Sequence, residues 1–301
     1  MTSRHAREAG LRSIPPGPSP VDLHTHTHRS DGILSPDDLV AAAGAVGVRI
    51  LAITDHDTLA AFRDLDGRTS SLAPGLTLVP GVEINAVASI AADLWERELH
   101  ILGYGMDPDD DAFETLLGHQ REARRMRFER AIARLRELGL SVDEQLETLD
   151  RGAQDAPGRP TLARALVRAG HATSVEDAFA RILGFGKPGY VPRQGVGPRE
   201  AIEAIRTAGG VAVLAHFGVA AERRSIVAGL VELGLRGVEV YYRRFDPDTT
   251  AAVAAVADEL GLLRTGGSDY HGDDETYAAA HAALWVPAEV GETLRATLAG
   301  R

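Results

Sequence analysis

Short runs of consecutive apolar residues recur along the chain, and turn residues or a polar side chain end each run. Because the apolar residues are consecutive rather than alternating, the pattern indicates buried strands covered on both faces, as in a parallel sheet. The expected strands occupy residues 21–26, 49–54, 76–84, 99–104, 211–216, 237–242 and 262–269.

Segments with helical spacing alternate with these strands. One covers 35–47, where Ser35 can cap the helix and Pro36 fits its first turn; others cover 197–210 and 246–261. Strand–helix alternation over this length predicts a closed or nearly closed α/β barrel of about seven strands.

The alternation stops in the middle of the chain, where residues 107–186 show helical patterns and no clear strand. We expect this segment to be a helical insertion domain over the barrel mouth. Residues 20–106 and 187–301 then form the barrel. Residues 1–19 are rich in Pro, Gly, Ser and Arg, which predicts a disordered leader.

The composition excludes several kinds of functional site and partner. The chain lacks cysteine, which excludes disulfides, thiolate metal sites and cysteine nucleophiles. A net charge of −11 argues against general nucleic-acid binding. There is neither a signal-peptide pattern nor an apolar run long enough to span a membrane, so we expect a cytoplasmic protein with no membrane partner and no evident stable protein partner.

Histidines and carboxylates recur where the expected strands end. The C-terminal ends of barrel strands meet on one face, so these side chains should converge there. Residues two apart on a strand share a face, which lets His24 and His26 bind one ion, and Asp269 and His271 have the same spacing. The other candidates are His56, Glu83, His100 and His216.

Each of these pieces alone has an ordinary structural explanation. The SDG sequence at 30–32 is typical of a turn, and TDHD at 54–57 can cap a helix. Independent accidents would not place such residues at nearly every strand end, so together they predict a metal centre. The role of His28 stays open between a ligand, a proton-transfer group and a loop residue.

The ordered motifs resemble those of the polymerase and histidinol phosphatase (PHP) family. They are VDLHTHTHRSDG, AITDHD, GVEI, HILGY, VLAH and GGSDYH, and the match covers residues 21–106 and 187–286. The resemblance implies a distorted (β/α)7 barrel, similar in layout to amidohydrolases, with two or three divalent ions. Histidine and carboxylate ligands suit Mn, Zn or Fe.

Carried onto this sequence, the resemblance assigns a first ion to His24, His26, Glu83 and Asp269. Glu83 bridges to a second ion, held also by His100 and His216, and a third ion takes Asp31, His56 and His271. Every expected ligand position is filled, as in a catalytic member with a trinuclear centre.

The middle segment and GKPGYVP at 186–192 look like the branch of nucleoside 3′,5′-bisphosphate phosphatases and 5′–3′ exoribonucleases. The sequence departs from that branch at Thr161, where the branch has His, and at Phe217, where it has Pro. The first departure leaves the substrate in doubt. The resemblance implies a hydrolase that removes a phosphate from a small phosphorylated metabolite, a nucleoside 3′,5′-bisphosphate first of all, by attack of a hydroxide that bridges two ions.

Further roles follow as hypotheses. His216 or Asp269 can carry a proton, and Asp57 can orient His56. Arg159 and Lys187 are candidates for phosphate contacts, although each could instead form a surface salt bridge. The arginines between 121 and 136 indicate a solvated helix, or a helix of which one or two arginines reach the cavity.

Other functions remain open. A 5′–3′ exoribonuclease on short oligonucleotides would show an open groove beside the ions, whereas a cavity closed by the insertion favours small molecules. A histidinol-phosphate phosphatase, a metal-dependent amidohydrolase and a non-enzymatic regulatory domain are further alternatives. The complete ligand set argues against the regulatory domain, and the basic residues near the site favour phosphate over amide.

Overall fold

The computed structural model describes residues 18–87, 98–148, 156–272 and 275–301. Residues 1–17, which make up most of the predicted disordered leader, lie outside the described part of the chain.

The core of the fold is a seven-stranded sheet whose strands follow one another in chain order. Its two edges approach each other, because Leu23 N donates to Gly266 O at 3.0 Å and Thr25 pairs with Tyr270 in a parallel bridge. The sheet therefore nearly closes into the predicted barrel. The strands are β1 (Val21–Asp22), β2 (Ile50–Ile53), β3 (Thr77–Val87), β4 (Glu98–Tyr104), β5 (Val211–Leu214), β6 (Gly237–Tyr242) and β7 (Leu263–Gly267).

One strand runs against the others. β4 pairs antiparallel with both β3 and β5, whereas the remaining neighbours are parallel. The expectation of parallel strands was wrong for β4, because a strand covered on both faces is equally apolar in either direction. The reversal places the start of β4, including His100, at the edge where the parallel strands end.

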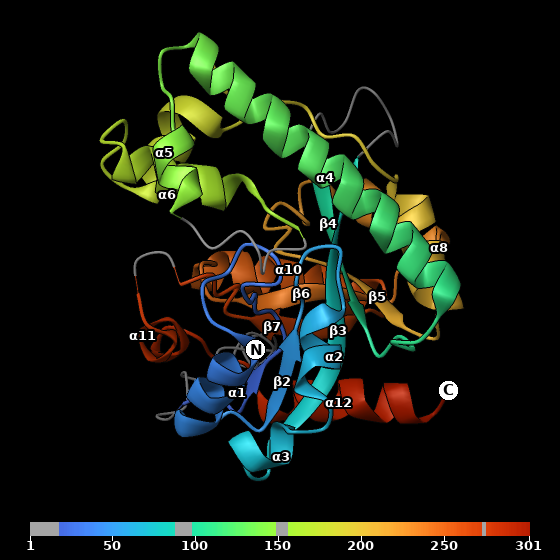
Figure 1. Ribbon diagram of the computed structural model, residues 1–301. Helices are drawn as coiled ribbons and strands as arrows, with labels where there is room; N and C mark the ends of the chain where they lie inside the picture. The colour runs from blue at the N-terminus through green and yellow to red at the C-terminus, as the bar shows by residue number, and fades with distance from the viewer. Residues whose placement is uncertain (1–17, 88–97, 149–155, 273–274) are drawn as a thin grey trace, which may run out of the picture.

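Helices cover the outside of the sheet (Figure 1). The three predicted ones are present as α1 (Pro36–Ala45), α8 (Pro198–Thr207) and α10 (Pro247–Glu259), and Ser35 Oγ caps α1 by accepting from Asp38 N at 3.1 Å. The others of this layer are α2 (Ala60–Leu65), α3 (Thr69–Leu72), α9 (Arg224–Glu232), α11 (Tyr277–Ala282) and α12 (Ala288–Ala299).

The segment between β4 and β5 is helical, as its pattern predicts. In Figure 1 the long helix α4 crosses the upper part of the molecule, with α5 and α6 near its far end. Phe128 and Leu135 of α4 pack in one apolar cluster with Leu162 and Leu166 of α6. The elements are α4 (Asp111–Glu137), α5 (Asp143–Glu147), α6 (Arg159–Arg168), α7 (Val175–Ala178) and the π-helix η1 (Phe179–Leu183). Within the described residues, no helix is long and apolar enough to cross a membrane.

Candidate metal centre

The structure gathers the histidines and carboxylates of the strand ends into three adjacent groups. In each group, one nitrogen or oxygen atom per residue lies within 4.8 Å of the corresponding atoms of the others. The groups are His24, His26, Glu83 and Asp269; Glu83, His100 and His216; and His26, Asp31, His56 and His271. They match the three predicted ligand sets, with His26 added to the third. Ion binding by them stays a prediction.

Glu83 stands where all three groups meet. Its Oε2 lies 3.2 Å from His26 Nε2 and 3.2 Å from His56 Nδ1, while its Oε1 lies 2.6 Å from His100 Nδ1 and 3.3 Å from His216 Nε2. The two oxygens of one carboxylate thus face different groups of histidines, as a carboxylate that bridges two cations would. Glu83 lies inside β3 rather than at its end, because β3 continues to Val87.

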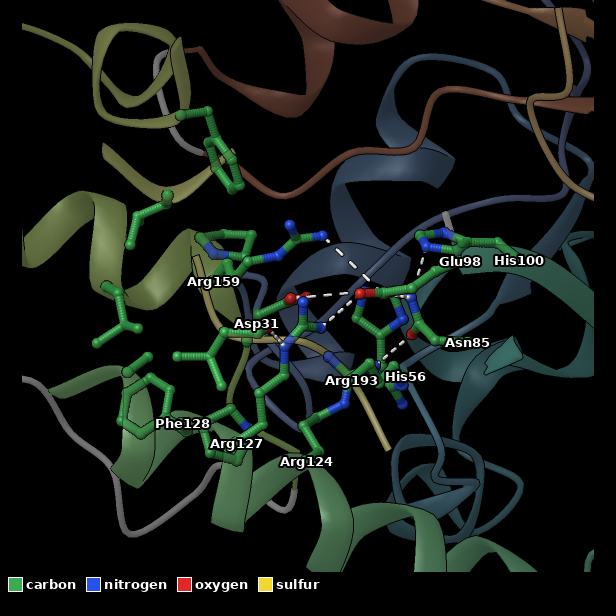
Figure 2. Close-up of a pocket in the computed structure, with 18 of the residues that line it drawn as sticks. Asp31, His56, Asn85, Glu98, His100, Arg124, Arg127, Phe128, Arg159 and Arg193 are labelled. Carbon is green, nitrogen blue, oxygen red and sulfur yellow. Dashed lines mark hydrogen bonds and ion pairs between the residues drawn. The ribbon is translucent and has the colours of Figure 1, made fainter. Parts of the chain in front are cut away.

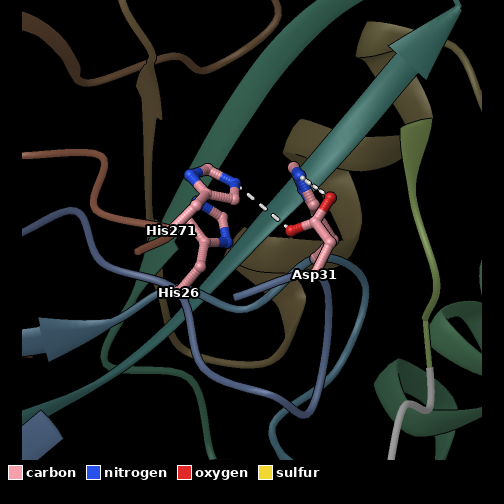
Figure 3. Close-up of side chains that lie close together, drawn as sticks. His26, Asp31 and His271 are labelled. Carbon is pink, nitrogen blue, oxygen red and sulfur yellow. Dashed lines mark ion pairs between the residues drawn. The ribbon is translucent and has the colours of Figure 1, made fainter. Parts of the chain in front are cut away.

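Figure 3 shows His26, Asp31 and His271 of the third group close together, on the segments that follow β1 and β7. His271 Nε2 is 3.2 Å from Asp31 Oδ1, and the rings of His26 and His271 stack with centroids 4.1 Å apart. A buried carboxylate fixes the loop that carries Asp31: Asp55 accepts from Thr27 N at 2.7 Å and from Ser30 Oγ at 2.6 Å. Asp55 therefore supports the site from outside it.

The donor set fits divalent cations. The Nε2 of His24, both ring nitrogens of His26, both carboxylate oxygens of Asp31 and the Nδ1 of His56 are buried without a hydrogen-bond partner. Buried polar atoms are otherwise nearly always paired. Cations held between imidazole nitrogens and carboxylate oxygens would give these atoms partners, and this ligand chemistry suits Mn, Zn or Fe.

The charges also fit. Burial raises the pKa of Glu83, but the positive charges of His100, His56 and His24 outweigh it and hold the pKa well below its usual value. Burial lowers the pKa of His26, yet the carboxylates of Asp269 and Glu83, 3.3 and 3.2 Å from its Nε2, raise that pKa to about 10. The carboxylates are therefore ready to bind cations, while cation binding must displace a proton from His26.

A buried carboxylate that the sequence did not reveal orients two of the histidines. Glu239 of β6 lies 3.1 Å from His24 Nδ1 through its Oε1 and accepts from His216 N at 2.7 Å through its Oε2. This contact turns the Nε2 of His24 toward Glu83 and Asp269, the usual role of such a carboxylate beside a ligand histidine. The only sequence signal was an acidic residue inside an apolar strand.

Three site residues have backbone angles that non-glycine residues seldom adopt. The φ angles of Asp57, His216 and Asp269 are 55°, 29° and 50°. Residues in this region cluster at functional sites, where the surrounding structure holds them in place. Each lies two to four residues beyond the end of a strand, β2, β5 or β7.

A cavity of about 200 Å³ opens beside the three groups. Side chains from the segment between β4 and β5 form much of its wall, and Figure 2 shows the four arginines among them. Apolar side chains, Phe128, Leu162, Phe179, Leu183 and Val191, complete the lining. The four arginines are Arg124 and Arg127 of α4, Arg159 of α6, and Arg193.

Two carboxylates contact these arginines, Asp57, which is fully buried, and Glu98, which is partly buried. Asp57 Oδ2 lies 3.0 Å from Arg124 Nε and 2.8 Å from Arg193 Nη2. Glu98 Oε1 lies 2.7 Å from Arg127 Nη1. Four guanidinium groups against two carboxylates leave this wall with positive charge, which suits an anionic group.

Of the two residues predicted to bind phosphate, one lines the cavity and the other does not. Arg159 lines the cavity, 3.9 Å from Glu98, with its guanidinium over the Phe179 ring. Lys187 is exposed and does not line the cavity. The carboxylate of Asp57 accepts hydrogen bonds from Arg124 and Arg193. Among the described residues it makes no hydrogen bond to His56, so the predicted role of Asp57 in orienting His56 is not supported by a contact.

The sequence missed most of the arginine wall. Arg124 and Arg127 were among several arginines expected on a solvated helix, and their spacing of three residues was the available signal that they share a face. Arg193 and Asn85 lie in no recognisable motif, and only the fold brings them to the cavity. Thr161, the departure from the family branch, is buried in α6 and does not line the cavity.

Comparisons with known proteins show what this chain resembles. The PHP domain family matches residues 22–146. A 5′–3′ exoribonuclease Rnm of Escherichia coli is 37% identical over 89% of this chain and 90% of its own length. A 3′,5′-nucleoside bisphosphate phosphatase of Chromobacterium violaceum is 31% identical over 85% of this chain and 88% of its own. A solved structure from Bifidobacterium adolescentis, which its description assigns to the metal-dependent phosphoesterases, superposes with a TM-score of 0.79 at 30% identity, over 96% of this chain and 100% of its own.

Proposed function

Because the chain belongs to the PHP family of metal-dependent phosphoesterases and is a hydrolase of phosphate esters, we propose that it removes a phosphate from nucleoside 3′,5′-bisphosphates. The single observation that carries the proposal is the cavity with two unlike walls. The three candidate metal groups form one wall and four arginines form the other. A substrate with two phosphates can place one phosphate on each.

The apolar lining supports a nucleoside between the two phosphates. Phe128 and Phe179 offer aromatic surface, and Leu162 and Leu183 add aliphatic surface. Small-molecule sites commonly combine such a lining with a few convergent charged groups. Side chains of α4 and α6 line this cavity of about 200 Å³, and a cavity of that size favours a small molecule over a long polymer.

We assign two or three divalent ions, Mn, Zn or Fe, to the three groups. Such ions would supply an activated water and offset charge on the phosphate oxygens. The two proton-transfer candidates, His216 and Asp269, belong to the candidate ligand groups and are assigned first as ligands. The arginine wall orients the second phosphate.

The test is phosphate release from adenosine 3′,5′-bisphosphate, adenosine monophosphates and histidinol phosphate, with hydrolysis of an amide substrate measured beside it. The protein is stripped with a chelator and then assayed with Mn²⁺, with Zn²⁺ or with no added metal. We expect release from the bisphosphate only with metal, and its loss in His216→Ala. His119→Ala, which changes an exposed histidine of α4, is the matched control.

If the metal-loaded protein released phosphate from the monophosphates or histidinol phosphate and not from the bisphosphate, the substrate assignment would be wrong. If chelation left the rate unchanged, the metal centre itself would be wrong. Hydrolysis of the amide alone would move the chain to another reaction class.

A further inference from the structure

Asn85 lies between the two walls of the cavity, and the proposed function gives it no role. It follows Glu83 by two residues in β3, so the two side chains share one face of the strand. Across the antiparallel pairing of β3 and β4, Asn85 stands opposite His100. Asn85 is only 4% exposed and lines the cavity, and Figure 2 shows it close to His100 and Glu98. An uncharged polar side chain thus stands between a candidate ligand and the arginines.

The contacts of Asn85 fix the orientation of its amide group. Its Oδ1 accepts from Nη2 of Arg124, while its Nδ2 lies 2.5 Å from His100 Nε2 and 3.5 Å from Glu98 Oε2. A guanidinium group only donates hydrogen bonds, and an ionised carboxylate only accepts them. The amide oxygen therefore faces Arg124 and the amide nitrogen faces Glu98. Because that nitrogen also faces His100, the Nε2 of His100 accepts its hydrogen bond.

An ion on His100 would reverse this hydrogen bond. His100 Nδ1 lies 2.6 Å from Glu83 Oε1 and 3.1 Å from His216 Nε2, so Nδ1 is the nitrogen that faces the second metal group. A ring nitrogen that binds an ion carries no hydrogen, and the hydrogen of the neutral ring is then on the other nitrogen, which donates it to an acceptor. Nε2 then needs an acceptor, and Asn85 supplies one by turning its oxygen away from Arg124.

We propose that Asn85 is a positioning residue that makes ion binding and phosphate binding depend on each other. An ion on His100 draws the amide oxygen from Arg124, and the released Nη2 of Arg124 donates to the substrate phosphate. Arg124 keeps its place at the cavity, because its Nε donates to Asp57 Oδ2 at 3.0 Å. The inference rests on the proposed function for the identity of that phosphate. Since linkage is reciprocal, a bound phosphate that holds Arg124 in turn favours the ion.

One substitution separates the two effects. In Asn85→Asp, the carboxylate has nearly the same shape and accepts from Arg124 and from His100 at the same time, so the two donors no longer compete. The ion should bind more tightly, because its histidine gains a charged acceptor. The phosphate should bind more weakly, because Arg124 stays in an ion pair and the wall gains a negative charge. A variant that merely loosened the structure would weaken both.

The experiment measures both kinds of binding in solution. Calorimetric titration of the chelated protein measures Zn²⁺ binding, and titration with adenosine 5′-phosphate measures anion binding with and without Zn²⁺. We expect Asn85→Asp to bind one Zn²⁺ about tenfold more tightly than wild type. The factor by which Zn²⁺ strengthens the binding of adenosine 5′-phosphate should be smaller in this variant by about fivefold or more. Gln194→Glu makes the same exchange of amide for carboxylate at an exposed position outside the cavity, and should change neither value.

Nuclear magnetic resonance gives a readout on the wild-type protein that does not depend on turnover. Asn85 is the only asparagine of the chain, so ¹⁵N-labelling of the asparagine side chain gives a single pair of amide signals. Saturation with Zn²⁺, which is diamagnetic, should move the hydrogen-bonded proton of this pair upfield, because Nδ2 gives up its contact with His100.

The outcomes separate this inference from the proposed function. Unchanged Zn²⁺ affinity in Asn85→Asp, or amide signals that Zn²⁺ leaves in place, would overturn the role of Asn85 even if the enzyme cleaves the bisphosphate. Weaker binding of both Zn²⁺ and adenosine 5′-phosphate would also overturn it and make Asn85 a structural residue. If wild type shows the expected shift and the variant binds Zn²⁺ more tightly, the role of Asn85 stands, and failure to release phosphate from the bisphosphate would overturn the proposed function alone.

Discussion

At the scale of single residues, Asp57 holds two arginines of the cavity by ion pairs and is not itself a member of the metal groups. Its carboxylate is fully buried and accepts from Arg124 and Arg193, whose side chains are 6% and 2% exposed. Two buried guanidinium groups thus depend on one carboxylate. A buried charge that loses its partner is far more costly than an exposed one.

Asp57→Asn should therefore destabilise the protein by about 2–3 kcal/mol, measured as the free energy of unfolding in urea. Asparagine tolerates the positive φ of this position, so the loss reports the charge and not the backbone. Asp66→Asn is the control, because Asp66 has a φ of 41° and is exposed. Equal stability of the two variants would show that the arginines do not need this carboxylate.

Glu98 makes the stability of the fold depend on pH through its ion pairs with the arginines of the cavity. Burial raises its pKa, but the charges of Arg127, Arg159 and Arg193 lower it overall from 4.5 to about 2. A group whose pKa is depressed on folding stabilises the fold above its unfolded pKa, and loses that contribution as pH falls through the folded pKa. The pKa of Arg127, lowered by burial to about 10, keeps that residue charged throughout the acid range.

We expect Glu98→Gln to be less stable than wild type by about 3 kcal/mol at neutral pH, with the difference shrinking as pH falls from 4.5 toward 2. Urea unfolding of both proteins at several pH values measures this difference in the free energy of unfolding. Glu203→Gln, at an exposed position of α8, should show no such trend. A difference between wild type and Glu98→Gln that stayed constant with pH would contradict the pairing.

At the scale of elements, α4 has two chemically different faces. Arg124 and Arg127 are buried and line the cavity, whereas Arg125 is 53% exposed and pairs with Glu122 and Glu129 on the helix surface. Neighbouring residues of one helix point about 100° apart, so adjacent arginines can have separate roles. The alternative that one or two of these arginines reach the cavity is confirmed.

Arg124→Lys should lower kcat/KM for the bisphosphate by about tenfold or more, chiefly through KM, because lysine cannot reproduce the planar guanidinium contacts. Steady-state kinetics on the metal-loaded enzyme test this. Arg125→Lys makes the same exchange one residue along the helix and should leave both constants unchanged. Similar effects from the two variants would contradict the division of the helix into faces.

At the scale of the whole molecule, the metal groups depend on closure of the barrel between β1 and β7. Gly267 is packed so closely against the segment just beyond β1 that a Cβ atom there would lie 2.4 Å from both the Cβ and the backbone nitrogen of His24. Asp269 N donates to His24 O at 2.7 Å just beyond this contact. The same close approach thus joins the sheet edges and places two candidate ligands.

Gly267→Ala should destabilise the fold by about 2–3 kcal/mol or more and weaken Mn²⁺ binding, because the methyl group forces β1 and β7 apart. Thermal unfolding and metal titration measure the two effects. Gly229→Ala, in α9 with nothing within 4 Å of the added carbon, should instead stabilise by about 0.5–1 kcal/mol. Normal metal binding by Gly267→Ala would separate the metal site from barrel closure.

The sequence by itself predicted the seven strands and three of the flanking helices, because local apolar runs, caps and short-range spacing are displayed directly by a chain. The residues of the three metal groups followed from their positions at strand ends together with the resemblance to the PHP family. Only the tertiary structure decided the direction of β4, the buried state of Arg124 and Arg127, and the contributions of Glu239, Glu98 and Arg193. These depend on which distant segments meet, and a buried strand or an arginine-rich helix has the same local pattern whichever partner it finds.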